Sequence, residues 1–287
     1  MPTVLNENAR LLKAFMALLL ALAACPPLGA AELGQPPREG AGISAPATLP
    51  SRNFVTATLS DGLDLACAPL HWEGRDWAAM AVPALGLVAL IKTDPQSYAL
   101  LHHKQDWLES SMPIATDFGE GAYAALGTAG LWGLGEALGQ DELAASSSSA
   151  LEAMAFCAVA SPVFKYAFAG DRPSEGEQDR RLFDYGYPGA SPSFPSGHTL
   201  VAFALAETYG ASYGRYWTYP LACIVAYSRI YLGAHWASDV AAGALLGAAM
   251  GHVAVTSREG KGAPRSWKFS LGPDERGNMV AEARIRY

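Results

Sequence analysis

The chain has 287 residues, of which 51% are hydrophobic and 16% are charged. This composition is typical of a globular or membrane-associated protein and excludes a disordered one. The formal net charge is -7, and no long block of Lys or Arg occurs. Nucleic-acid binding is therefore disfavoured, because it needs a basic surface. In so acidic a chain, a local cluster of cations would indicate a specific anion site.

The N-terminus is typical of an export signal. Arg10 and Lys13 precede or flank the start of an apolar run, Ala14 to Ala24, that is too short to span a bilayer. Two processing routes remain open. Cleavage after the small residues 29–31 would make residues 1–31 a signal peptide, whereas a lipobox would leave Cys25 lipidated. Both routes predict an exported protein of the periplasm or cell envelope, and an integral membrane protein ranks behind them.

Composition divides the rest of the chain into three segments. Residues 32–52 are rich in Pro, Gly, Ala and Ser, which predicts a flexible linker. Residues 53–256 carry apolar stretches without strict alternation, which favours helices over strands. Residues 257–287 predict a tail with a small β-hairpin. The expected fold class is all-α, a helical bundle. Its expected helices are Trp77–Ile91, Ala122–Leu138, Ala150–Ala169, Leu200–Tyr213, Tyr216–Leu232 and Trp236–Val255.

The sequence leaves open whether these helices cross a membrane. The first stretch has fifteen residues and contains Pro83, and later stretches carry Glu207, Asp239 and His252. Few of them would make a comfortable span of about 20 apolar residues. Together with a cleavable leader, these features favour a soluble or surface-associated helical domain.

Three short segments hold most of the conspicuous polar residues of the apolar half. The first contains Lys165, whose charge is costly to bury without an anion, and Arg172, whose planar donors suit phosphate. In the second, Ser196 and Gly197 directly precede a helical run, whose free backbone N–H groups form an anion site. The segments are Lys165–Pro173 (KYAFAGDRP), Pro195–His198 (PSGH) and Ser228–Asp239 (SRIYLGAHWASD).

The histidines of these segments suggest catalysis. His198 stands at the mouth of the anion site, where it could protonate a leaving oxygen. His235 and Asp239 are four residues apart and would share one face of a helix. The carboxylate could then fix the imidazole tautomer and leave the other nitrogen free to attack. No cluster of Asp and Glu indicates a metal, so charge stabilisation would come from cations such as Arg229 and from backbone amides.

Each of these residues alone has an ordinary structural explanation, such as a solvated helix-end charge, but the combination is specific. The segments resemble the signature of the type 2 phosphatidic acid phosphatase and vanadium haloperoxidase superfamily, Lys-x6-Arg-Pro, Pro-Ser-Gly-His and Ser-Arg-x5-His-x3-Asp. Every fixed position matches, and the resemblance covers roughly residues 120–256.

The resemblance implies a helical bundle of the acid phosphatase type. It also implies metal-independent hydrolysis of phosphate monoesters, lipid phosphates or diphosphates through a phosphohistidine. His235 would be the nucleophile, Asp239 would orient it, and His198 would be the general acid. The implied phosphate-binding residues are Lys165, Arg172, Ser196, Gly197 and Arg229.

Two alternatives remain at this stage. A vanadate-dependent haloperoxidase would use the same cradle, with vanadate as its cofactor. In a phosphatase no cofactor is expected, and vanadate would be an inhibitor. The compact Lys-x6-Arg-Pro spacing resembles the phosphatase branch more. A non-catalytic envelope lipoprotein is the other alternative, against which the intact pair of histidines argues. The expected partner is a phosphorylated small molecule or lipid, with association at a membrane surface, and the oligomeric state is open.

Overall fold

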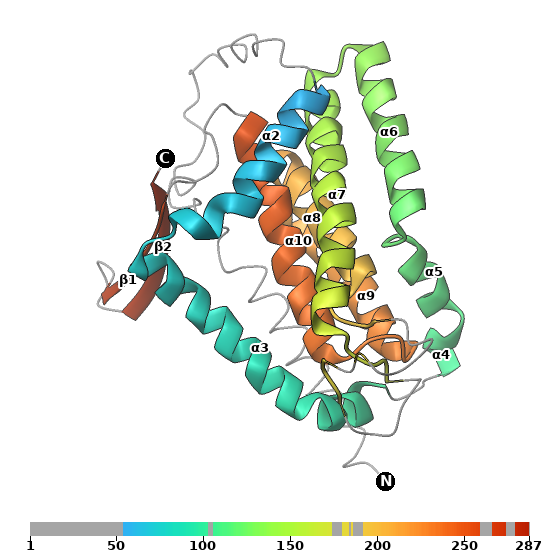
Figure 1. Ribbon diagram of the computed structural model, residues 1–287. Coiled ribbons are helices and arrows are strands. Elements are labelled where there is room, and N and C mark those ends of the chain that lie inside the picture. The colour runs from blue at the N-terminus through green and yellow to red at the C-terminus, as the bar shows by residue number, and fades with distance from the viewer. Residues whose placement is uncertain are drawn as a thin grey trace.

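The computed structural model describes residues 54–102, 106–173, 180–183, 185, 192–258, 266–273 and 279–286. Within these ranges the chain is a bundle of helices followed by two paired strands (Figure 1). The predicted all-α class is confirmed. The predicted signal peptide and linker, with Cys25, lie outside the described residues. The helices are α2 (Phe54–Cys67), the 3-10 helix η2 (Ala68–His71), α3 (Gly74–Leu101), α4 (Asp106–Glu109), α5 (Ser111–Asp117), α6 (Gly121–Leu138), α7 (Asp141–Phe168), α8 (Gly197–Tyr213), α9 (Arg215–Tyr231) and α10 (Ala237–Arg258).

The centre of the bundle is formed by α7, α8, α9 and α10 (Figure 1). One apolar cluster lies between α8, α9 and α10 and includes Phe203, Ile230 and Val240. A second joins α7, α8 and α10 and includes Phe156 and Leu200. Both clusters contain many alanines, which let the helices approach closely. α8 and α10 contribute to both clusters, so these two helices form the axis of the core.

The contact between α8 and α10 is a seam of backbone on backbone. A Cβ added at Gly243 would lie 2.6 Å from the carbonyl oxygen of Ser196, and one added at Gly251 would lie 2.7 Å from that of Ala204. Only glycine fits such an approach. The seam brings the N-terminal ends of the two helices together, because the backbone N–H of Ser196 donates to the carbonyl of Asp239 at 3.0 Å.

The tail forms two antiparallel strands. They are β1 (Ser266–Pro273) and β2 (Met279–Arg286), with Ser266 opposite Arg286 and Pro273 opposite Met279.

Polar residues inside the apolar helices face one another at the end of the bundle where α8 meets α9. The carboxylate of Glu207 is fully buried and accepts bonds from the guanidinium of Arg215 at 2.7 and 2.9 Å. The hydroxyl of Tyr219 donates to the same carboxylate at 2.6 Å, and the Nδ1 atom of His252 lies 3.4 Å from it. These charges are therefore satisfied within the protein, and the outer faces of the helices stay apolar.

Three helices are long and apolar enough to cross a membrane, namely α3, α7 and α10. Only 11% of the most apolar window of α3 is buried inside the protein. Its exposed residues include Val82, Leu85 and Val88. A helix face of this kind needs an apolar environment, which a bilayer supplies. In Figure 1, α3 diverges from the bundle along most of its length.

The predicted localisation, an exported periplasmic or lipid-anchored protein, is therefore wrong, and the apolar helices point to a membrane protein. The stretch that the sequence predicts to have fifteen residues is a helix of 28. Pro83 and Pro95 both lie inside this helix and do not end it. The acidic residues that seemed unsuited to a span are turned into the bundle. Glu207 and Asp239 are both fully buried, so neither would face lipid.

Candidate active site

The residues of the three sequence segments meet at one end of the bundle. Lys165 lies in the last turn of α7, and His198 lies in the first turn of α8. Arg229 lies in the last turn of α9, and Asp239 lies in the first turn of α10. Because α7 and α9 end where α8 and α10 begin, this end of the bundle carries all the predicted site residues.

His235 lies in the loop between α9 and α10 and is 2% exposed. Its Nδ1 atom is 3.4 Å from Oδ2 of Asp239. The expectation that the pair shares one helix face is wrong, because α10 begins only at Ala237. The loop turns at Gly233, whose φ of +70° favours glycine. The backbone N–H of Trp236 donates to Oδ2 of Asp239 at 3.0 Å, so the carboxylate also closes the first turn of α10.

The first turn of α8 offers backbone donors. Ser196 is the N-cap, and the N–H of Leu200 makes the first intrahelical bond, to the Ser196 carbonyl at 3.0 Å. The N–H groups of residues 197–199 precede that bond and are free to bind an anion. The hydroxyl of Thr199 donates to the Ser196 hydroxyl at 3.0 Å, so Ser196 keeps its own proton for donation.

The cations come from three places. The Nζ atom of Lys165 donates to the carbonyl of Pro192 at 2.6 Å, which draws α7 toward the approach to α8. The Nη1 atom of Arg229 donates to the hydroxyl of Thr116 on α5 at 2.6 Å. The buried Nε of Arg229 has no acceptor among the described residues. Arg172 is half-buried and follows the end of α7.

These charges act together on the two imidazoles. Burial, and then the positive charges of Arg229 and Lys165, lower the pKa of His235 to about 4, although Asp239 acts in the opposite direction. Burial and then the charge of Arg229 lower the pKa of His198 to about 4 as well, with Arg172 acting in the same direction. Both imidazoles are therefore neutral at neutral pH. Neutral His235 can donate Nδ1–H to Asp239 and keep a lone pair on Nε2.

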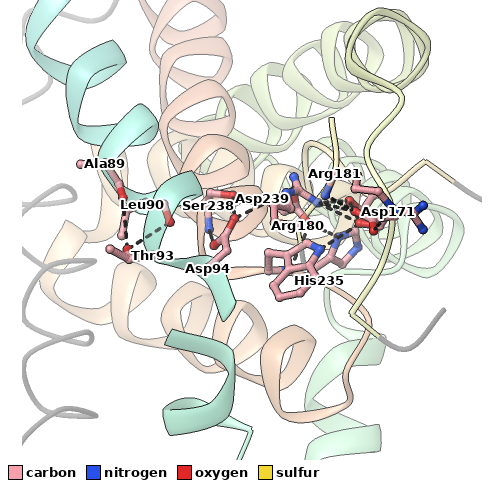
Figure 2. A network of polar contacts seen from close by, with 12 residues as sticks. Ala89, Leu90, Thr93, Asp94, Asp171, Arg180, Arg181, His235, Ser238 and Asp239 are labelled. Atoms are coloured by element: carbon pink, nitrogen blue, oxygen red, sulfur yellow. Dashed lines mark hydrogen bonds and ion pairs between the residues drawn. The ribbon is translucent and has the colours of Figure 1, made fainter. Parts of the chain in front are cut away.

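The structure adds three residues that the sequence reasoning missed, namely Asp94, Thr116 and Arg180. Asp94 lies on α3 and Thr116 lies on α5, both far from the three segments along the chain. Arg180 lies between the first two segments, and its guanidinium is 2.6 Å from Asp239 (Figure 2). Two of these residues had a signal in the sequence. Asp94 is a carboxylate that follows a long apolar run, and Arg180 is one of two adjacent arginines in a polar loop.

Fold and site together define a class: a helical protein with a histidine–aspartate pair set beside a helix N-terminus and a group of cations. Residues 147–262 match the family model described as the PAP2 superfamily. This region contains all three motifs, and its match to the family model confirms the resemblance that the motifs predicted.

Named relatives also match part of the chain. The lipid A 4'-phosphatase of Porphyromonas gingivalis is 35% identical over 100 residues, which are 33% of this chain and 42% of the relative. The putative undecaprenyl-diphosphatase YbjG of Escherichia coli is 32% identical over 121 residues, which are 41% of this chain and 56% of the relative. The chain thus spans about half the length of these relatives. Among solved structures, Aquifex aeolicus LpxE is 20% identical, with a TM-score of 0.44, over 56% of this chain and 93% of LpxE.

Proposed function

We propose that this protein is a phosphatase that removes phosphate from a lipid phosphate or diphosphate, with His235 as the nucleophile. The observation that carries the proposal is the site itself. A neutral, buried imidazole held by Asp239 lies in the field of Lys165 and Arg229, beside the free N-terminus of α8. Such a site can bind a phosphate and stabilise the charge that develops on it.

The proposed reaction has two steps. In the first, Nε2 of His235 attacks phosphorus, the P–N bond forms and the bond from phosphorus to the leaving oxygen breaks. His198 gives its proton to that oxygen, while Asp239 stabilises the positive charge on His235. In the second step, His198 takes a proton from water, and the resulting hydroxide oxygen displaces His235 from phosphorus and releases phosphate.

His198 must be protonated for the first step, although its pKa in the free protein is lowered to about 4. Substrate binding supplies the change, because a phosphate brings negative charge beside the imidazole and raises its pKa. The same charge offsets the cations that keep His198 neutral in the free protein. The bound substrate would in this way help to protonate His198, the acid that its own cleavage requires.

A lipid is the favoured substrate because of the surface around the site. Apolar side chains from α4, α5 and the end of α7 are exposed at this end of the bundle, where the cations lie. The named relatives, a lipid A phosphatase and an undecaprenyl-diphosphatase, also favour a lipid. These exposed side chains are Trp107, Ile114, Phe118, Val163 and Tyr166.

The test is a hydrolysis assay on the full chain in detergent micelles with a chelator present. We expect phosphate release from phosphatidate or an isoprenoid diphosphate, with vanadate as an inhibitor. The variant His235→Ala should lose activity by roughly 10⁴-fold or more, because it lacks the nucleophile. Phosphate release from the lipids should exceed that from p-nitrophenyl phosphate at equal concentration.

Two results would overturn the proposal. Equal turnover by the wild type and His235→Ala would remove His235 from the reaction. Halide oxidation with added vanadate, together with no release of phosphate from any ester, would instead make the protein a haloperoxidase. The variant His71→Ala is a matched control, because His71 is an exposed residue whose Nδ1 atom lies 3.2 Å from the nearby Cys67 carbonyl.

A further inference from the structure

Arg180 joins the first and third motif segments to Ser193, just before the second, although it belongs to none of the segments. Its side chain is only 3% exposed. Nη2 donates to Oδ1 of Asp239 at 2.6 Å. Nη1 donates to the carbonyl of Asp171, beside Arg172, and to the hydroxyl of Ser193, each at 2.8 Å. Figure 2 shows the guanidinium of Arg180 beside both Asp171 and Asp239.

A second carboxylate, that of Asp94, lies close to Arg180. Asp94 of α3 is fully buried, and its Oδ2 atom is 3.5 Å from Nε of Arg180. Asp94 accepts bonds from both the backbone N–H and the hydroxyl of Ser238, the residue directly before Asp239. Arg180 therefore lies between two buried carboxylates, one of which holds the backbone of α10 and the other of which faces His235.

The two oxygens of Asp239 have different partners. Oδ1 accepts from Arg180, whereas Oδ2 accepts from the backbone N–H of Trp236 and faces Nδ1 of His235. A carboxylate held on both sides cannot rotate without losing a charge-assisted bond. The ring of Trp236 also lies beneath the guanidinium, with its centroid 5.7 Å from Cζ, and its Nε1 donates to the Asp171 carbonyl at 2.9 Å.

We propose that Arg180, supported by Asp94, is a positioning residue that fixes the Asp239 carboxylate and through it the imidazole of His235. The inference rests on the function proposed above. Partners of this kind orient a catalytic histidine indirectly, as second-layer carboxylates orient histidines that bind metals.

Arg180 is not a phosphate-binding residue. Both terminal nitrogens donate to protein oxygens, and the remaining Nε lies beside Asp94. Loss of Arg180 should therefore affect the reaction step and leave phosphate binding intact, which separates it from Arg172 and Arg229.

The experiment compares the wild type with Arg180→Ala and Arg180→Lys in the hydrolysis assay. We expect kcat to fall by about 10–100-fold in both variants, with KM nearly unchanged. Guanidinium ion added to Arg180→Ala should restore part of kcat in a saturable manner. It should not restore Arg180→Lys, because the lysine chain fills the space. A purely structural role would not give this rescue.

Arg181→Ala is the matched control. The side chain of Arg181 is 49% exposed, and its Nε atom lies 3.4 Å from Asp171, so its loss should leave kcat at the wild-type level.

A wild-type kcat in Arg180→Ala would overturn the inference, as would a rise in KM that guanidinium does not reverse. If Arg180→Ala does not fold, Arg180→Lys alone tests the positioning role. A wild-type kcat in that variant would contradict the role, and a lower kcat at constant KM would support it. Failure of the wild type to hydrolyse any ester would instead contradict the proposed function.

Discussion

At the scale of single residues, the two imidazoles of the site have the same resting charge but need different charges during the reaction. The pKa of each is lowered to about 4, first by burial and then by neighbouring charges. His235 must stay neutral to attack, which suits its buried position. His198 must gain a proton from its surroundings, and it is the more exposed of the two.

The pH dependence of the reaction should follow from this difference. We expect kcat/KM to fall with decreasing pH through about 4, because protonation of His235 in the free protein removes the nucleophile. The basic limb of kcat should lie well above pH 4, because bound phosphate raises the pKa of His198. Profiles of kcat and kcat/KM against pH give the measurement. An acid limb of kcat/KM near pH 6.5, the ordinary histidine value, would contradict the assigned burial.

The same lowered pKa values affect stability. The unfolded chain binds protons at both histidines near pH 6.5, whereas the folded chain binds them only near pH 4. Their contribution to folding is therefore fully present above pH 6.5 and is lost as the pH falls through about 4.

At the scale of helices, the seam between α8 and α10 leaves no room for a side chain. A Cβ at Gly247 would collide with the carbonyl oxygen of Leu200, which belongs to the rigid backbone of α8. We expect Gly247→Ala to lower the free energy of unfolding by about 1–3 kcal/mol. Thermal unfolding in detergent measures the change.

Gly127→Ala on α6 is the control, because a Cβ there would meet nothing within 4 Å. Alanine favours a helix over glycine by up to about 1 kcal/mol, so this variant should be unchanged or more stable. Equal loss of stability in both variants would show that the seam is not closely packed.

The sequence could predict helices wherever apolar residues run without alternation. Four of the six expected stretches agree with the helices within a few residues at both ends, and a fifth, Ala150–Ala169, misses the start of α7 at Asp141. The sequence did not predict α2, which lies in a segment of mixed character, and it predicted too short a helix for α3. Lys92, Asp94 and Pro95 mark an apparent end to the apolar run, but the helix continues past them to Leu101. The reason is tertiary, because Asp94 is paired with Ser238 and Arg180 and so does not face lipid.

The candidate site, like the fold, could be predicted where the pattern is local and not where the contact is tertiary. Fixed spacings within each motif indicate which residues act, because neighbours on a helix or turn must lie close together. Arg180 and Thr116 contact the motif residues across 59 and 113 positions of sequence. A local pattern can draw attention to a residue such as Arg180, but only the folded chain shows which motif residue it contacts.

At the scale of the whole molecule, exposed aromatic residues gather at the two ends of the bundle. The helix α10 between these ends has 22 residues, or about 33 Å at 1.5 Å per residue, close to the bilayer core of about 30 Å. Trp and Tyr favour the boundary between lipid and water. The aromatic residues at the site end include Trp107, Tyr123 and Tyr166, and those at the other end include Tyr213, Tyr216 and Trp217.

The protein should therefore remain in membranes under conditions that release peripheral proteins. We expect the full chain to stay in the pellet after alkaline carbonate washing and to be extracted only by detergent. Immunoblots of the pellet and supernatant provide the measurement. Release by carbonate would contradict the spanning assignment of α3, α7 and α10.

The buried bond between Asp94 and Ser238 has a consequence for how the protein is made. The two residues are 144 positions apart, so α3 leaves the ribosome long before α10 is synthesised. During that interval the carboxylate of a newly inserted helix has no partner from α10, at a cost of about 2.5–3.5 kcal/mol at the centre of a bilayer and less near its edge. We expect stable integration of α3 to wait for α10, and nascent chains truncated before residue 238 to be poorly retained in the bilayer.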